Sequence, residues 1–263
     1  MACDSLKEIV QLLEENERFE QLINRYNQNN QDRSFWFELA FACWMESNGY
    51  EVEYEVNANT DNDSSIDYAL DLNEHRCLFE LFRVENSDEV RAYIEAQQEQ
   101  DPLFESYQLI LNSDHKNPHF TTAAQIIRMQ EKILEKVRKF PTPENTMLSI
   151  IVCDCSTVHQ GLLDDEDVRI TMFGVSQNII WQEYWGDERL KGMYETDYNF
   201  RGSDEFRVRV DAVIFLPKLE PNGLDNAMIT LNPEMDDEKK ENFIDILKDI
   251  KCLENLNLVE SAL

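Results

Sequence analysis

Residues 35–85 decide the fold of this chain, and they contain four runs rich in apolar side chains: FWFELAFACWM at 35–45, YEVEYEV at 50–56, IDYAL at 66–70 and CLFELFRV at 77–84. The first run is apolar on nearly every side, which predicts a buried helix over 34–48. The second run alternates apolar and acidic residues and predicts a half-exposed strand, whereas the fourth is almost continuously apolar and predicts a central strand. The segment therefore predicts a helix followed by a three-strand meander.

The elements expected on either side of this segment extend it to an α/β core. An amphipathic helix is expected over 5–24, and another helix over 86–100. A long helix over 122–140 precedes an apolar run at 147–153. A helix that leads into a buried strand is typical of a crossover to a parallel strand. The predicted architecture is an αβββαβ core with a mixed central sheet flanked by helices.

The C-terminal part of the chain has a weaker pattern. Residues 156–204 begin polar and acidic and continue into an aromatic cluster, Trp181 to Phe200, so they are predicted to form an ordered insertion. Alternation at Phe206, Val208 and Val210 predicts a strand over 205–216, and a closing amphipathic helix is expected over 236–253. Because no segment resembles a linker, residues 1–263 are predicted to form a single domain: a core at about 34–155, the insertion, and a strand and closing helix over 205–263.

The chain is strongly acidic, with 24 Lys and Arg against 53 Asp and Glu and a formal net charge of −29. Proteins that bind nucleic acid usually present a basic face, so a chain of this charge must concentrate its few cations locally or bind something else. The expected outward face of the 122–140 helix offers one such basic strip, formed by Arg128, Lys132, Lys136, Arg138 and Lys139. The acidity is equally consistent with high solubility, with mimicry of nucleic acid or with docking to a basic protein partner.

Cysteine usage and the absence of long apolar runs indicate a cytoplasmic protein. The six cysteines are scattered through core-like contexts, which fits reduced thiols in a cytosol. Cys153 and Cys155 have the wrong spacing for a structural zinc site and are expected to be buried small hydrophobic residues. The sequence has neither an export signal of the usual pattern nor an 18-residue apolar run, so no membrane partner is expected.

Three carboxylates lie on the predicted elements of the core: Glu38 in the first helix, Asp67 in the second strand and Glu80 in the third. With its elements and acids in this order, the segment from about 34 to 155 resembles the PD-(D/E)XK nuclease-like superfamily, whose fold is that of the restriction endonucleases. The resemblance implies that the three acids bind a divalent metal, Mg²⁺ or Mn²⁺, and that a lysine two residues after the last acid positions the attacking water. Phe82 occupies that lysine position.

The chemistry of this family fits carboxylates on neighbouring strands, because their side chains can reach the same end of a sheet. Mg²⁺ takes oxygen ligands, and a bound metal activates water for phosphodiester hydrolysis. A cation replacing the missing lysine is expected from the 122–140 helix, with Lys132 as the catalytic candidate beside Asp67 and Glu80. The residues of this helix expected to contact phosphate are Gln125, Arg128, Lys132 and Lys136.

The sequence leaves two functions open. The first is a magnesium-dependent, endonuclease-like hydrolase that cleaves the phosphodiester bonds of nucleic acid. The second is a catalytically inactive nuclease-like scaffold that serves as an acidic protein-interaction or regulatory module, with Phe82 marking the loss of catalysis. In a purely structural alternative, Asp67 and Glu80 pair with Arg83 or Arg76, and Glu38 bonds a buried tryptophan or a backbone group.

Overall fold

A mixed seven-stranded sheet forms the centre of the protein in the computed structural model, which describes residues 6–29, 32–58, 64–100, 121–157, 163–175, 190–218, 227–250, 253 and 256–261. The strands lie in the sheet in their sequence order. They are β1 (Glu53–Val56), β2 (Ile66–Leu72), β3 (His75–Arg83), β4 (Met147–Asp154), β5 (Ala212–Leu216), β6 (Met228–Leu231) and β7 (Asn257–Leu258). The first three form an antiparallel meander, β3 to β5 are parallel, β6 is antiparallel to β5, and β7 is parallel to β6.

The helix and meander predicted from residues 35–85 are present. The helix is α3 (Arg33–Ser47), and eight of its residues, from Phe37 to Met45, are buried. It ends before Gly49, whose φ of 85° lies in the left-handed region that favours glycine. β4 pairs in parallel with β3, as the helix-then-strand pattern indicates. The expectation of an α/β protein with a mixed sheet flanked by helices is therefore confirmed.

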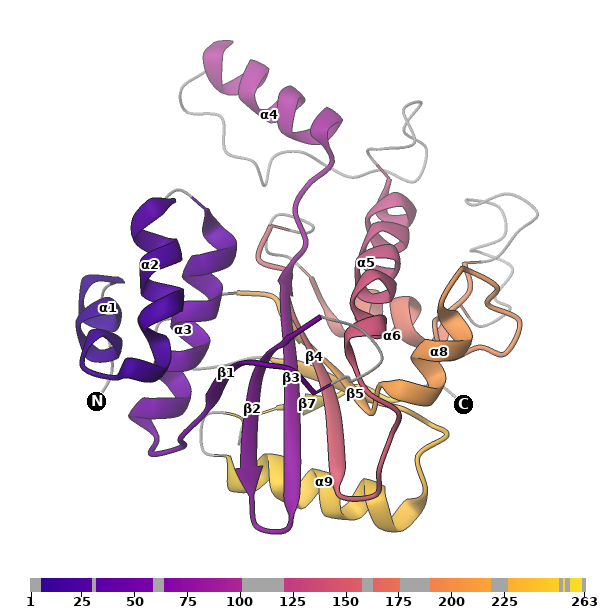
Figure 1. The fold of residues 1–263 in the computed structure, drawn as a ribbon. Helices are drawn as coiled ribbons and strands as arrows, with labels where there is room; N and C mark the ends of the chain where they lie inside the picture. Colours follow the sequence, from indigo (N-terminus) through magenta and orange to yellow (C-terminus); the bar gives the residue numbers. More distant parts are fainter. Residues whose placement is uncertain are drawn as a thin grey trace.

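One face of the sheet is covered by α1 (Leu6–Glu14), α2 (Glu20–Gln28), α3 and α9 (Asp237–Asp249), as Figure 1 shows. Aromatic rings fill the contact between α3 and the strands. The ring centroid of Phe41 lies 5.2 Å from that of Tyr68 and 5.3 Å from that of Phe79, and all three side chains are buried. The near-continuous apolar surface of α3 is explained by this position between the sheet and the two N-terminal helices.

The other face is covered by α5 (Thr122–Lys136), the 3₁₀ turn η4 (Val137–Lys139), α6 (Asp165–Phe173) and α8 (Ser203–Arg209) (Figure 1). Met193, Tyr194 and Tyr198 are buried in the same cluster, so the described part of the 156–204 segment packs onto this face. Cys153 and Cys155 are also buried here, as expected. In contrast, α4 (Asp88–Gln100) stands away from the sheet in Figure 1, and Val90 is its buried residue.

The expectation of one amphipathic helix over 5–24 is wrong in its described part. The chain forms α1, then a 3₁₀ turn, η1 (Glu17–Phe19), and then α2. The side chain of Asn16 accepts a hydrogen bond from the backbone N–H of Arg18 and so caps η1. Local capping of this kind competes with a continuous helix, and it allows both Leu13 and Phe19 to be buried.

The predicted strand over 205–216 is also wrong in its first half. Residues Ser203–Arg209 form the helix α8, and the strand β5 begins only at Ala212. Phe206 and Val210 are buried and lie four residues apart, which suits a helix as well as alternation does, whereas Val208 between them is 63% exposed. The closing helix is present as α9, but the sequence did not indicate β6 or β7, which extend the sheet beyond β5.

Part of the predicted aromatic cluster, from Trp181 to Trp185, lies outside the described residues, as does the first residue of the N-terminal helix expected over 5–24. Among the helices that the structure describes, none combines the length and the apolar character that crossing a membrane requires.

The aromatic contact between α3 and β3 should be a major source of stability. Phe79→Ala is expected to lower the free energy of unfolding by about 3–5 kcal/mol, because it leaves a cavity in a fully buried cluster. Phe200→Ala, at a ring that is 46% exposed, is the matched control and should change stability by less than about 1 kcal/mol. Urea denaturation followed by circular dichroism measures both. Equal losses in the two variants would contradict the assignment of the core.

Candidate functional site

Asp67 and Glu80 meet at the point where the β2–β3 ladder ends. The register pairs Tyr68 with Phe79, and its next position places Asp67 opposite Glu80, so both side chains lie on the α5 face of the sheet. Oδ2 of Asp67 accepts a hydrogen bond of 2.7 Å from the backbone N–H of Leu81, in place of a further ladder bond. Glu80 is completely buried, while the Asp67 side chain retains 16% exposure.

Two lysines from the end of α5 bind this acid pair. Nζ of Lys136 lies 3.0 Å from Oε1 of Glu80, and Nζ of Lys139 lies 2.7 Å from the same oxygen and 3.6 Å from Oδ1 of Asp67. The 3₁₀ turn η4 brings the two lysines together, because side chains three residues apart are eclipsed in a 3₁₀ turn but not in an α-helix. Two ammonium groups, one from the end of α5 and one from η4, therefore contact the same oxygen of Glu80.

Phe82 is part of the arrangement that holds these lysines. It follows Glu80 by two residues and therefore lies on the same face of β3. Its ring lies 5.8 Å from Nζ of Lys136, a distance at which an ammonium group is attracted to the aromatic face. The Phe82 ring therefore supports Lys136, a lysine from another element.

Burial sets the protonation of this cluster. It raises the pKa of Glu80 to about 7, with the neighbouring Asp67 charge adding to the rise and the two lysines opposing it. Burial also raises the pKa of Asp67, against the opposing effect of Lys139. For Lys139, burial lowers the pKa, but Asp67 and Glu80 outweigh it and the net shift is upward. Lys139 therefore stays charged at neutral pH, while Glu80 is poised between its two forms.

One oxygen of this cluster has no hydrogen-bond donor. Oε2 of Glu80 is buried and accepts no hydrogen bond, while the carboxyl groups of Glu80 and Asp67 are hydrogen-bonded to each other, which opposes the effect of burial on the pKa of Asp67. A proton or a cation at this oxygen would satisfy it, because a buried charge requires a partner. Two carboxylates are a ligand set that suits Mg²⁺, which commonly binds one or two carboxylates and retains waters or substrate oxygens. In the part of the chain that the structure describes, no group of three or more His, Cys, Asp or Glu side chains has a metal-binding arrangement.

Glu38 lies on the opposite face of the sheet. Its Oε2 accepts a hydrogen bond of 2.9 Å from the hydroxyl of Tyr54, and that hydroxyl also accepts one of 3.1 Å from Nη1 of Arg25. Burial and then the charge of Asp67 raise the pKa of Glu38 to about 7. Glu38 therefore interacts electrostatically with Asp67, but it belongs to a separate set of hydrogen bonds, and the expected tryptophan or backbone partner is wrong.

The helix residues predicted to serve the site have different positions. Lys132, the catalytic candidate, pairs with Glu135 at 2.7 Å, whereas the lysines that contact the acid pair are Lys136 and Lys139. The expectation that Lys136 and Lys139 face outward is wrong, because both side chains form ion pairs with the buried Glu80. Gln125 is 2% exposed with an unpaired Oε1, and Nε of Arg128 is buried and unpaired, so neither belongs to an open basic strip.

The arginines expected to neutralise the acids have other partners. Nη1 of Arg83 lies 3.5 Å from Oδ2 of Asp154, and Arg76 pairs with Glu53 and Asp71. The role of Lys139 was missed because it follows from the 3₁₀ turn. A signal was nevertheless present: Pro141 follows closely and ends the helix, and helix ends often tighten into 3₁₀ turns.

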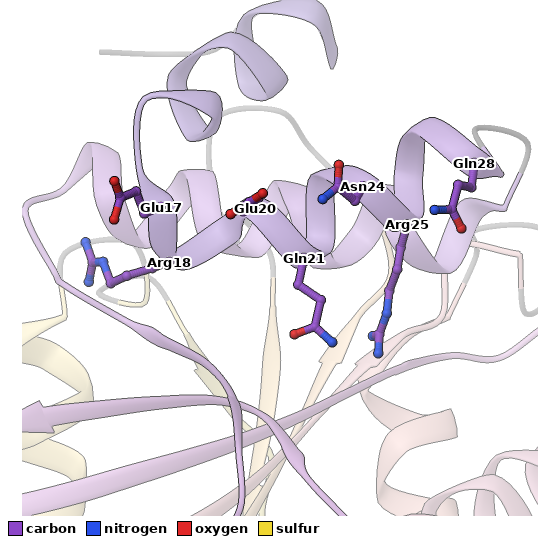
Figure 2. Close-up of a pocket in the computed structure, with 7 residues that line it drawn as sticks. All are labelled: Glu17, Arg18, Glu20, Gln21, Asn24, Arg25 and Gln28. Carbon is purple, nitrogen blue, oxygen red and sulfur yellow. The ribbon is translucent and has the colours of Figure 1, made fainter.

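A surface pocket of about 420 Å³ lies along η1 and α2, away from the acid pair. Figure 2 shows Gln21 and Arg25 projecting from α2 toward the strands. The lining residues are Glu17, Arg18, Glu20, Gln21, Asn24, Arg25 and Gln28. Arg25 links the pocket to Glu38 through Tyr54, but it also forms an ion pair of 2.5 Å with Glu55. The chemistry of the acid pair, rather than the size of this pocket, therefore identifies the candidate site.

Glu38 should give the protein a distinctive pH dependence. Its folded pKa of about 7 exceeds its ordinary value of 4.5, so the folded state binds the proton more tightly, and stability from this group is lost as the pH rises through 7. Glu38→Gln should reduce the fall in unfolding free energy between about pH 5 and pH 8 by up to about 3 kcal/mol. Urea denaturation at each pH measures this, with exposed Glu205→Gln as the control. An unchanged pH profile in Glu38→Gln would refute the assignment.

Removing one lysine should leave the buried Glu80 charge undercompensated. Lys139→Met is expected to lower stability by about 1–3 kcal/mol near pH 8, and by less near pH 5.5, where Glu80 is protonated. The control Lys132→Met removes an exposed ion pair and should change stability by less than about 1 kcal/mol. Thermal unfolding at both pH values distinguishes the two variants, and a loss in Lys139→Met that does not depend on pH would argue against the pairing with Glu80.

No family model, no curated protein and no solved structure matches the chain. The interpretation of the site therefore rests on its own geometry: two facing carboxylates at the end of the β2–β3 ladder, two lysines from the end of α5, and a third acid on the other face of the sheet.

Proposed function

We propose that this chain is a divalent-metal-dependent hydrolase of the phosphodiester bonds of nucleic acid, built on a PD-(D/E)XK-like core. The supporting observation is the convergence of two acids and a lysine: Nζ of Lys139 lies 2.7 Å from Glu80 and 3.6 Å from Asp67. The acids come from consecutive strands, and the lysine comes from the turn that follows the next long helix. Acids that hold a cation beside a fixed ammonium group form a combination suited to phosphoryl chemistry.

The proposed roles follow from position. Asp67 and Glu80 would hold Mg²⁺ or Mn²⁺, with the unpaired Oε2 of Glu80 as one ligand atom. The metal would activate water and neutralise charge on the phosphate. Lys139, whose raised pKa keeps it protonated, would stabilise the negative charge that develops on the phosphate oxygens. Lys136 would neutralise Glu80 from the face of the Phe82 ring.

A lysine from α5 and η4 can replace one from the strand because electrostatic stabilisation depends on position in space and not on position in sequence. The requirement is an ammonium group held within a few ångströms of the acids before the reaction, so that little reorganisation is needed. The Phe82 ring and the 3₁₀ turn restrict the two side chains, whose exposures are 25% for Lys136 and 28% for Lys139.

The proposal predicts cleavage of nucleic acid that requires Mg²⁺ or Mn²⁺. Asp67→Asn and Glu80→Gln should lower the rate by at least about 100-fold, and Lys139→Met by about 100-fold, because each removes a group that contacts metal or phosphate. Lys132→Met is the matched control on the same helix and should stay within about twofold of the native rate. Gel-resolved cleavage of labelled single- and double-stranded DNA and RNA measures these rates.

Metal binding gives a second measurement that does not depend on turnover. Calorimetric titration with Mn²⁺ should show binding that is lost in Asp67→Asn and retained in Lys132→Met. Failure to cleave any of the four substrates, together with no Mn²⁺ binding at millimolar concentration, would refute the proposal.

A non-catalytic interaction module is the second candidate. It is favoured by the complete pairing of Oε1 of Glu80 with Lys136 and Lys139, which makes the pair self-neutralising without a metal. On this alternative the cluster has only a structural role, and the acidic surface binds a basic protein partner. Such binding should weaken steeply with added salt and should survive Asp67→Asn.

A further inference from the structure

The charged side chains around the acid pair bear on the length of the phosphodiester substrate that could bind there. Lys136 and Lys139 are the cations that contact the acid pair, and their charges are balanced by Asp67 and Glu80. The neighbouring cation Lys132 is paired with Glu135. A phosphate that enters the site therefore meets two ammonium groups, and the next basic side chain along α5 is already neutralised by an acid.

Exposed acids lie on both elements that lead away from the site. On α5, the side chain of Glu135 is 58% exposed. Beyond the end of β3, the side chains of Glu85 and Asp88 are 53% and 86% exposed, and both are ion-paired with Arg91. Duplex DNA carries one charge per ~1.7 Å of its axis, so a long duplex would place many phosphates beside ion pairs that have no net positive charge, and it would gain contact with few cations.

The net charge of −29 acts in the same direction over a longer range. At low salt, repulsion between the protein and a polyanion extends over ~10 Å or more, whereas a molecule with one or two phosphates interacts mainly with the local lysines. We infer that the phosphodiester bound at Lys136 and Lys139 belongs to a dinucleotide-sized molecule rather than to a long nucleic acid. This inference rests on the proposed function and narrows its substrate class.

The sign of the salt dependence tests the inference. With Mg²⁺ present, the native protein would be given a dinucleotide, a single strand of about 24 nucleotides and a duplex of the same length, at about 50 to 200 mM salt. The dinucleotide should be cleaved with a kcat/KM that changes less than about threefold over this range, and at least about tenfold faster than either polymer. Binding of the labelled duplex, measured by fluorescence anisotropy, should increase with salt, because screening reduces repulsion.

Reversing one surface charge tests whether the acids near the site weaken duplex binding. Glu135→Lys should strengthen duplex binding by about threefold at low salt and make its increase with salt less steep, while dinucleotide cleavage stays within about twofold. Glu205→Lys on α8 makes the same change in net charge and should have a smaller effect on duplex binding.

The possible outcomes separate the two proposals. Metal-dependent cleavage of a polymer as fast as the dinucleotide, or tight duplex binding that weakens steeply with salt, overturns the substrate class and leaves the proposed function intact. If neither the dinucleotide nor the polymers are cleaved and Mn²⁺ does not bind, the proposed function fails and the inference fails with it.

Discussion

The burial of Glu80 in the sheet is the constraint on which the rest of the site depends. A carboxylate with no exposed surface is tolerated only when it is protonated or accompanied by cations. Lys136 and Lys139 supply the cations, and they reach the same oxygen because the chain tightens into a 3₁₀ turn after α5. The end of this helix therefore supports the buried charge of Glu80, and the ring of Phe82 holds Lys136 beside it, whereas the neighbouring Asp67 opposes that charge.

A buried cluster of charges of this kind costs the fold stability, but it can serve a chemical reaction. Apolar residues of similar volume often stabilise a fold at least as well as a buried ion pair does. In this cluster, burial and the charge of a second acid, Asp67, raise the pKa of Glu80, and Oε2 of Glu80 accepts no hydrogen bond. Glu38 adds a third acid on the other side of the sheet, with a pKa raised to about 7. Perturbed carboxylates gathered in one place are more frequent at functional sites than elsewhere, which is why this cluster is the candidate site.

The acidity of the chain and the chemistry of the site are compatible once the local and global charges are considered separately. The acid pair and its lysines nearly cancel each other, so a small anion meets little repulsion within a few ångströms of Lys139. Beyond that distance the nearby acids Glu135, Glu85 and Asp88 are ion-paired, and the net charge of −29 dominates. A protein of this kind can bind a phosphodiester without being a general binder of polyanions.

The sequence alone determined the meander, the long crossover helix and the acids Asp67 and Glu80, because each depends on a local period or on neighbours a short turn apart. It could not distinguish helix from strand at Phe206–Val210, since both are compatible with buried residues four positions apart. Only the tertiary structure decided which lysines meet Glu80, because Lys136 and Lys139 are 56 and 59 residues away from it and align only through a 3₁₀ turn. It also placed Glu38 on the opposite face from Asp67, because the side to which α3 packs is set by burial of its apolar surface and not by the position of its single acid.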